Sequence, residues 1–199
     1  MTPLFSWVLG ACVGSFLNVC LVRWKSGGQI LTPPSFCPRC KKSIQWFDNI
    51  PIVSFFLLGG KCRSCQKPIS WQYPMVEMAT AALFFANSWK FSKESFPFIV
   101  AGFLLVCFLI LLVVSDIKWK LLPHLFNNLF ILTGFFFIAF YFSSSSSGIF
   151  TAASEFIIIG SVMFGLIQFF PNGLGGGDIK LIAGLAVWMG FLKAVLILI

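Results

Sequence analysis

Long apolar runs alternate with short polar segments along most of the chain. Each run is about 15 to 22 residues long, near the roughly 20 that a helix needs to cross the hydrocarbon core of a bilayer. The runs are residues 4–22, 75–89, 98–115, 125–142, 149–170 and 179–199. The period-two alternation of a membrane β-barrel is absent. The pattern therefore predicts an all-α, polytopic transmembrane helical bundle of about six spans.

Composition supports a membrane protein. Hydrophobic residues make up 58% of the 199 residues, charged residues only 10%, and phenylalanine alone occurs 26 times. An average soluble domain has about 25% charged residues. The net charge of +8 could indicate nucleic acid, but the basic residues lie in loops beside the apolar runs. No nucleic-acid-binding motif accompanies them, so we expect no nucleic-acid partner.

Charge predicts the orientation of the spans. Arg23 and Lys25 follow the first run and no basic residue precedes it, the reverse of a cleaved signal peptide, so we expect a retained span. The polar segment 23–74 carries eight basic residues and one acid, Asp48. The positive-inside rule makes this segment a cytoplasmic loop. Counting alternate crossings from there, the serine run 143–147 joins two spans on the outside.

A stripe of small and polar residues lies within the first run. Gly10, Gly14, Ser15 and Asn18 follow one another at helical spacing. Small residues at this spacing allow two membrane helices to approach closely. We therefore expect a helix-packing role for this stripe.

Four of the seven cysteines form two Cys-x-x-Cys pairs in the predicted loop. They are Cys37, Cys40, Cys62 and Cys65. Two such pairs can supply four thiolates at tetrahedral geometry, which suits a structural zinc ion in a zinc-ribbon-like loop. Disulfides are the alternative, disfavoured because the loop is assigned to the reducing side. The other three, Cys12, Cys20 and Cys107, lie inside predicted spans, where we expect them to pack.

Two acids mark the ends of apolar runs. Asp116 closes one run, and Asp178 opens another after a glycine-rich stretch, residues 172–177. That stretch matches neither a phosphate-binding loop nor a dinucleotide fingerprint. Either acid could simply stabilise a helix end, as Asp178 would at an amino terminus. For Asp116 the helix dipole is unfavourable, although Lys118 and Lys120 partly offset it.

The two acids together point to catalysis. Alternate crossings place Asp116 and Asp178 at the same depth on the cytoplasmic side. Two carboxyl groups close together can share a proton, so that one activates water while the other donates to a carbonyl oxygen. This is the chemistry of aspartic peptidases. For the single histidine, His124, we expect a solvated or capping role, because no second histidine or nucleophile constellation accompanies it.

Several ordered motifs resemble the prepilin peptidases, also called type IV leader peptidases. The resemblance runs nearly end to end. Its segments are 10–19, the cysteine loop 37–65, the entry to the second span 69–77, and the two aspartate motifs 116–123 and 175–181. The last is similar to the Gly-x-Gly-Asp signature shared by intramembrane aspartic peptidases. By this resemblance the catalytic residues are Asp116 and Asp178.

The resemblance implies more than the residues alone predict. Members lie in the bacterial inner membrane, surrounded by lipid, and cleave the leader of type IV prepilins or type II secretion pseudopilins at the cytoplasmic face. Many then methylate the new amino terminus with S-adenosylmethionine. Gly60 and Lys61 match positions tied to that cofactor, although a simple turn into the second cysteine pair would explain them equally well.

The resemblance also implies two parts, 1–90 with the cysteine loop and 91–199 with the peptidase. Family chains continue with further membrane helix after the second aspartate motif, whereas this sequence stops at Ile199, so we expect a shortened carboxy-terminal part. Two rivals to the peptidase remain. One is a non-catalytic membrane scaffold whose zinc loop docks components of a pilus or secretion assembly. The other is a chain that transfers methyl groups but does not cut.

Overall fold

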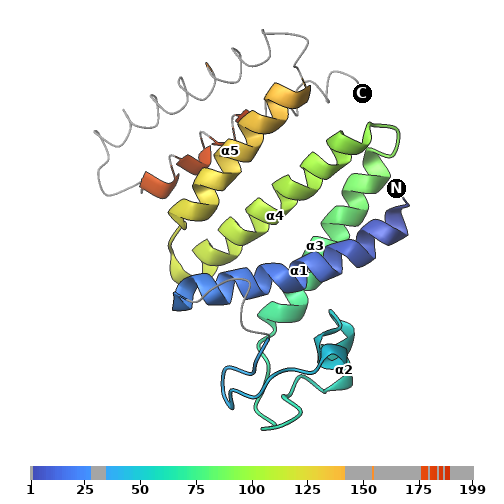
Figure 1. Ribbon diagram of the computed structural model, residues 1–199, viewed down its shortest axis with the longest axis vertical. Coiled ribbons are helices and arrows are strands. Elements are labelled where there is room, and N and C mark those ends of the chain that lie inside the picture. Colours follow the sequence, from blue (N-terminus) through green and yellow to red (C-terminus); the bar gives the residue numbers. More distant parts are fainter. Residues whose placement is uncertain are drawn as a thin grey trace. The chain divides into compact units, whose positions relative to one another are not determined.

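The computed structural model describes residues 2–27, 35–141, 154, 176–178, 180–182, 184–185 and 187–188 (Figure 1). Its named elements are α1 (Pro3–Ser26), η1 (Trp46–Asn49), α2 (Val53–Leu57), α3 (Gln72–Lys90), α4 (Phe96–Trp119) and α5 (His124–Tyr141). Within these residues the only β structure is two isolated bridges. The predicted all-α class therefore holds for the described part of the chain. The chain divides into two compact units, Met1–Leu111 and Leu112–Ile199.

Helix α1 has clear signals at both ends. Pro3 occupies its first turn, where the missing N–H has no intrahelical partner in any case. Gly27 ends the helix in the left-handed conformation, with φ 68°, and its amide donates to the carbonyls of Arg23 and Trp24. Arg23 and Lys25 in the last turn also favour this end of the helix dipole.

Helices α1 and α3 pack against each other through the small-residue stripe. A Cβ atom on Gly10 would lie 2.8 Å from Ala81 Cα, and one on Gly14 would lie 2.7 Å from Glu77 Cα. Such approaches exclude any larger residue, so the predicted packing role of these glycines is confirmed.

Hydrogen bonds between polar groups join α1 and α3 at both ends of their interface. Ser88 Oγ donates to Ser6 Oγ over 2.6 Å near one end. At the other end, Asn18 Nδ2 donates to the Tyr73 carbonyl over 3.1 Å. Contacts of early residues in α1 with late residues in α3 make the pair antiparallel.

The first half of α4 completes the first unit. The ring of Phe103 stacks on that of Phe84, with centroids 4.1 Å apart, and Ile99 joins them in a buried cluster. Asn87 Nδ2 donates to the Ile99 carbonyl over 3.0 Å, which pairs a polar side chain inside this apolar contact.

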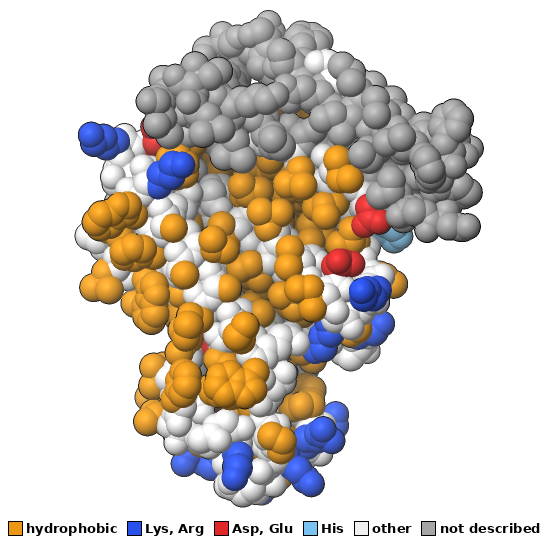
Figure 2. Space-filling view, turned by 180° about the vertical axis from the view of Figure 1, so that it is seen from behind, with side chains coloured by type: hydrophobic (Ala, Val, Ile, Leu, Met, Phe, Trp, Pro, Cys, Tyr) orange, Lys and Arg blue, Asp and Glu red, His pale blue; other side chains and the backbone are white. Residues whose placement is uncertain are grey.

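Two helices of the described part, α1 and α4, are long and apolar enough to cross a membrane. In α5 the apolar stretch His124–Ala139 is shorter. Large hydrophobic side chains are exposed over much of the helical surface, as the hydrophobic colouring of Figure 2 shows. Such a surface is suited to lipid and would promote association in water. Apart from Ser154, the predicted span 149–170 and the serine run lie outside the described residues, so the count of six spans stays a prediction.

Candidate active site and cysteine cluster

The two cysteine pairs form turns of the same construction. In the first, the Lys41 amide donates to the Cys37 carbonyl and the Cys37 amide donates to the Lys42 carbonyl, both over 2.9 Å. In the second, Gln66 and Lys67 take the corresponding places around Cys62, with the same two distances. Lys41 and Gln66 both have positive φ, 61° and 57°. The repeated turn directs each pair of sulfur atoms to one side of its own backbone.

The four sulfur atoms meet in one cluster. All four lie within 4.8 Å of one another, and the Sγ atoms of Cys37 and Cys65 are 3.9 Å apart. Tetrahedral zinc with Zn–S bonds of about 2.3 Å has sulfur atoms about 3.8 Å apart, so the cluster has the size that zinc requires. The cluster could therefore hold a metal ion, as the spacing predicts.

The pKa values of the two thiols in the second pair, Cys62 and Cys65, are shifted in opposite directions. Backbone amides of Cys65 and Ser64 donate to the Cys62 sulfur and lower its pKa to about 7. For Cys65 the Lys67 amide acts in the same direction, but burial and the neighbouring thiols outweigh it and raise the pKa to about 11. A bound cation would remove this difference in pKa direction, because a metal favours the thiolate form of every ligand.

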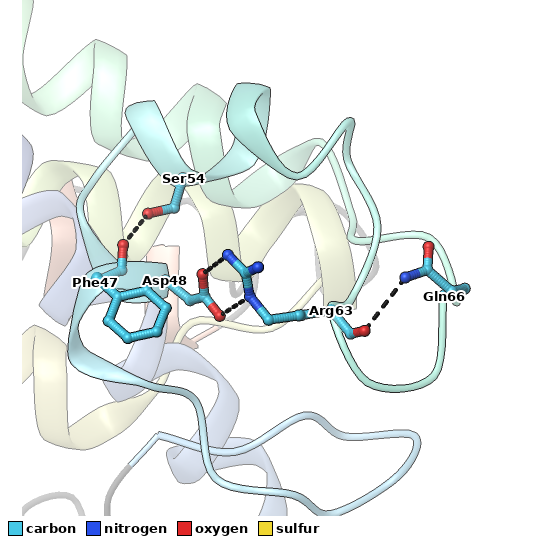
Figure 3. A network of polar contacts seen from close by, with 5 residues as sticks. All are labelled: Phe47, Asp48, Ser54, Arg63 and Gln66. Atoms are coloured by element: carbon cyan, nitrogen blue, oxygen red, sulfur yellow. Dashed lines mark hydrogen bonds and ion pairs between the residues drawn. The ribbon is translucent and has the colours of Figure 1, made fainter.

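An ion pair holds the second turn to η1 (Figure 3). Arg63 Nε and Nη2 donate to the two carboxylate oxygens of Asp48 over 2.8 and 2.7 Å. The guanidinium also lies over the Phe47 ring, 5.5 Å from its centroid. Ser54 Oγ donates to the Phe47 carbonyl over 2.9 Å and joins α2 to the same network. Sequence analysis assigned no role to Asp48, although it is the single acid of a basic loop.

Gly60 and Lys61 lie in the turn between α2 and the second cysteine pair. Gly60 has φ 68°, and a Cβ atom there would meet the Phe55 ring at 3.2 Å. The Gly60 amide donates to the Phe55 carbonyl and its carbonyl accepts from Ile69. Lys61 continues as a β-bridge to Pro68, with its side chain exposed. This geometry accounts for the glycine as a turn residue and leaves the lysine side chain accessible.

A buried acid of α3 contacts the cysteine loop. Glu77 is 7% exposed, and its Oε2 accepts a hydrogen bond from the Ile52 amide over 2.6 Å. Ile52 precedes α2 and has φ 64°, a rare conformation for a β-branched residue. This contact could not be predicted from the sequence. The signal available was an acid within an otherwise apolar run, which is a functional candidate by default.

Asp116 lies in the last turn of α4 with an exposed side chain. The helix ends at Trp119, and the next residue, Lys120, has φ 52°. The Lys120 amide donates to the Asp116 carbonyl over 2.8 Å and closes the final turn. Residues 121–123 then lead directly into α5, so Asp116 is one short connection away from the start of that helix.

Asp178 belongs to a helical segment that packs along α5. The residue before it, Gly177, approaches so closely that a Cβ atom would lie 3.0 Å from Leu122 Cβ. Asn127 Nδ2 donates to the Gly177 carbonyl over 2.8 Å. The Asp178 side chain is half-buried. These contacts fix the backbone immediately before Asp178 against the connection that follows Asp116.

Further contacts give the direction of this segment. A Cβ atom on Gly184 would meet Phe130 and Ile131 at about 3 Å. Trp188 Nε1 donates to the Phe130 carbonyl over 3.0 Å, and Trp188 fills the space beside Gly134. Later residues of the segment contact later residues of α5, so the two run parallel. Asp178 therefore lies beside the first turns of α5, at the end where Asp116 also lies.

Asn127 is the site residue that sequence analysis missed. It is fully buried, and its Oδ1 has no hydrogen-bond partner among the described residues. An asparagine inside an apolar helix was the only signal. Its neighbour His124, the first residue of α5, is exposed, in line with the solvated role expected for it.

The family model described as the bacterial peptidase A24 N-terminal domain matches residues 8–91, and that described as the type IV leader peptidase family matches residues 103–199. No solved structure matches the chain.

Curated relatives carry one recurrent name. A prepilin leader peptidase/N-methyltransferase of Klebsiella pneumoniae is 32% identical over 94% of this chain and 85% of its own length. Proteins of the same name from Neisseria gonorrhoeae and Bacillus subtilis are 32% and 34% identical, each over 92% of this chain and 72% of their own length.

Proposed function

Because the chain belongs to the type IV leader peptidase family, we propose that it cleaves the leader peptide of type IV prepilins or pseudopilins as an aspartic endopeptidase. The observation that carries the proposal is the contact of Leu122 and Asn127 with Gly177. It brings the connection after Asp116 against the backbone before Asp178. In a chain with six acids, this supports a shared catalytic task for these two.

The proposed reaction needs no cofactor. One carboxylate accepts a proton from water, whose oxygen attacks the scissile carbonyl, while the protonated partner donates to the carbonyl oxygen. The tetrahedral intermediate then collapses and the C–N bond breaks. The carboxyl that accepted the proton from water gives it to the leaving amine, and the hydroxyl of the intermediate returns its proton to the other carboxylate. The two carboxyl groups titrate as a pair, so the shared proton is assigned to the pair and not to Asp116 or Asp178 alone.

The proposal includes a membrane topology. About six spans cross the bacterial inner membrane, with the cysteine loop and both acids on the cytoplasmic side. Residues 1–90 form the part with the cysteine loop, and 91–199 form the peptidase. The excess of basic residues in the loop supports this orientation. A basic loop would not itself attract a basic leader, so recognition depends on the two acids and on helix contacts of the substrate.

We also propose a structural zinc ion and a second activity. Cys37, Cys40, Cys62 and Cys65 would hold the zinc, as the dimensions of their cluster allow. S-adenosylmethionine supplies an electrophilic methyl group. When bound, it would transfer this methyl group to the new terminal amine, with S-adenosylhomocysteine leaving and the amine losing a proton. The names of the relatives support this activity, and the exposed Lys61 side chain could pair with the cofactor carboxylate.

Co-expression with a prepilin tests the peptidase. The unaltered chain should remove the leader, whereas Asp116→Asn and Asp178→Asn should leave the prepilin uncut at equal membrane abundance. Glu94→Gln, a change of an acid in the α3–α4 connection, should cut normally. An uncut prepilin with the unaltered, intact chain would favour the scaffold. An added methyl group on the mature terminus would establish the second activity independently.

A further inference from the structure

Helix α2 exposes an unusual apolar face. Val53, Phe56 and Leu57 stand at i, i+3 and i+4, and Leu57 is 79% exposed. Its other face turns inward, because Ser54 is buried and bonded to the Phe47 carbonyl. A short helix in a water-exposed loop would normally show the reverse arrangement. The apolar face therefore needs a partner.

Two exposed tryptophans lie in the same loop as this face, and Trp71 contacts α2 directly. Trp71 packs against Phe55, with ring centroids 4.8 Å apart, and against Phe56 at 6.5 Å. On the η1 side, Trp46 is 80% exposed. We call the five residues Trp46, Val53, Phe56, Leu57 and Trp71 the apolar patch.

The depth of the patch follows from the contact between Glu77 and Ile52. Glu77 lies five residues into α3, or about 8 Å along a helix that rises 1.5 Å per residue. Its bond to the Ile52 amide therefore holds the start of α2 beside the first two turns of α3. Met75, in those turns, is 67% exposed. The patch thus continues the apolar surface of α3, which the proposed topology places in the membrane.

The charged side chains of the loop are distributed as expected for a patch at this depth. Residues 35–71 contain six basic side chains and one acid, Asp48, which is paired with Arg63. Figure 2 shows hydrophobic side chains continuing from the helices onto the loop, and lysine and arginine side chains gathered at the far end of the loop. An apolar layer with tryptophans, followed by a basic layer, is the arrangement found at a lipid–water interface.

We infer that the apolar patch inserts into the lipid interface of the leaflet nearest the loop and anchors the cysteine loop to the membrane surface. The inference goes beyond the proposed function; it rests on the membrane topology proposed there and not on peptidase activity. Lipid is the occupant because the patch continues the exposed apolar surface of α3, whereas a protein partner would have to cover both.

Fluorescence in reconstituted membranes tests the contact. The signal of interest is the difference between the unaltered chain and Trp46→Phe/Trp71→Phe, since it reports the two patch tryptophans alone. Lipids brominated near the headgroup end of the acyl chain should quench most of this difference, and lipids brominated near the tail end should quench less. Acrylamide in the water phase should have little effect.

A reverse pattern, with acrylamide quenching and no effect of brominated lipids, would overturn the inference. So would protection from acrylamide that arises only when a prepilin is added, because the patch would then be a substrate surface. As a second test, Phe56→Ser/Leu57→Ser should speed proteolysis of the loop several-fold in membranes. An unchanged rate in membranes, with zinc content preserved, would also contradict lipid anchoring.

Discussion

The backbone amide of Ile52 donates to the carboxyl group of Glu77 over 2.6 Å, so a buried acid of α3 holds the strained residue at which α2 begins. A positive φ at isoleucine costs on the order of 1–3 kcal/mol and persists only where its surroundings impose it. This bond joins the cysteine loop to α3.

Glu77→Ala should therefore loosen the loop. It leaves the Ile52 amide without its acceptor, at a cost of about 1–3 kcal/mol. Glu77→Gln keeps an acceptor oxygen and should lose less. Loop proteolysis in membranes measures the change. Equal loss in both variants would mean that the charge of Glu77, rather than the bond, matters.

Asn127→Ala should reduce cleavage without unfolding the protein. It removes the donor to the Gly177 carbonyl, and one hydrogen bond of about 1.4 kcal/mol corresponds to about tenfold in rate. The matched control is Asn128→Ala, because Asn128 is exposed one residue away. The prediction concerns prepilin cleavage at equal protein and equal melting temperature. Normal cleavage by Asn127→Ala would remove this residue from the site.

Gly14→Ala should destabilise the first unit. Its new methyl group would lie 2.7 Å from Glu77 Cα, and overpacking of this kind costs about 1–3 kcal/mol. Gly176→Ala is a suitable control for stability, because no atom lies within 4 Å of a Cβ atom there. Thermal unfolding in detergent should show a lower midpoint for Gly14→Ala alone. A shift of similar size in both variants would argue against the close α1–α3 approach.

The ion pair between Asp48 and Arg63 should stabilise the loop only above acid pH. Arg63 donates to Asp48 and lowers its pKa, so the folded state binds its proton less readily than the unfolded state. The contribution is therefore complete above the unfolded pKa of about 4 and disappears as the pH falls through the lower folded value.

Asp48→Asn is the variant that measures this dependence. The stability difference from the unaltered chain should be constant near neutral pH and should shrink below about pH 4. Urea titrations of loop proteolysis at several pH values provide the readout. A difference that grew toward acid pH would have the wrong sign and would exclude the pair as its cause.

Metal removal should free the loop. A strong chelator should make residues 37–65 accessible to protease, and metal analysis of the untreated protein should give one zinc per chain. Cys62→Ser should lose the metal, whereas Cys12→Ser, a change in α1 outside the cluster, should retain it. Zinc retained in Cys62→Ser would place the metal elsewhere.

Local pattern was sufficient for the features that depend on spacing. The glycine stripe of α1 and the two Cys-x-x-Cys pairs could be predicted because helical periodicity and a short turn fix which side chains share a face. The ends of helices could be predicted less well from the sequence. Helix α3 begins at Gln72, before the apolar run, since backbone hydrogen bonds rather than hydropathy decide where a helix stops.

Contacts between distant residues could not be predicted in the same way. The Ile52–Glu77 bond uses a backbone amide, which every sequence offers at every position, and it spans 25 residues. The Asp48–Arg63 pair needs two turns to fold before the charges meet. The only sequence signal at Asn127 was a polar side chain within an apolar run, and its partner is a backbone carbonyl of another helix. The catalytic assignment of Asp116 and Asp178 is a prediction that the cleavage experiments address.

The repeated cysteine turns have a consequence for the evolution of loop length. Each turn makes its own backbone hydrogen bonds, so a metal ion has only to close the ring between two preformed ends, Cys37 and Cys65, 28 residues apart. The entropy of ring closure grows with the logarithm of length, and doubling the enclosed segment would cost only about 0.6 kcal/mol. Insertions between Ile44 and Gln45, after the last backbone hydrogen bond of the first turn and ahead of η1, should therefore be tolerated without loss of the metal.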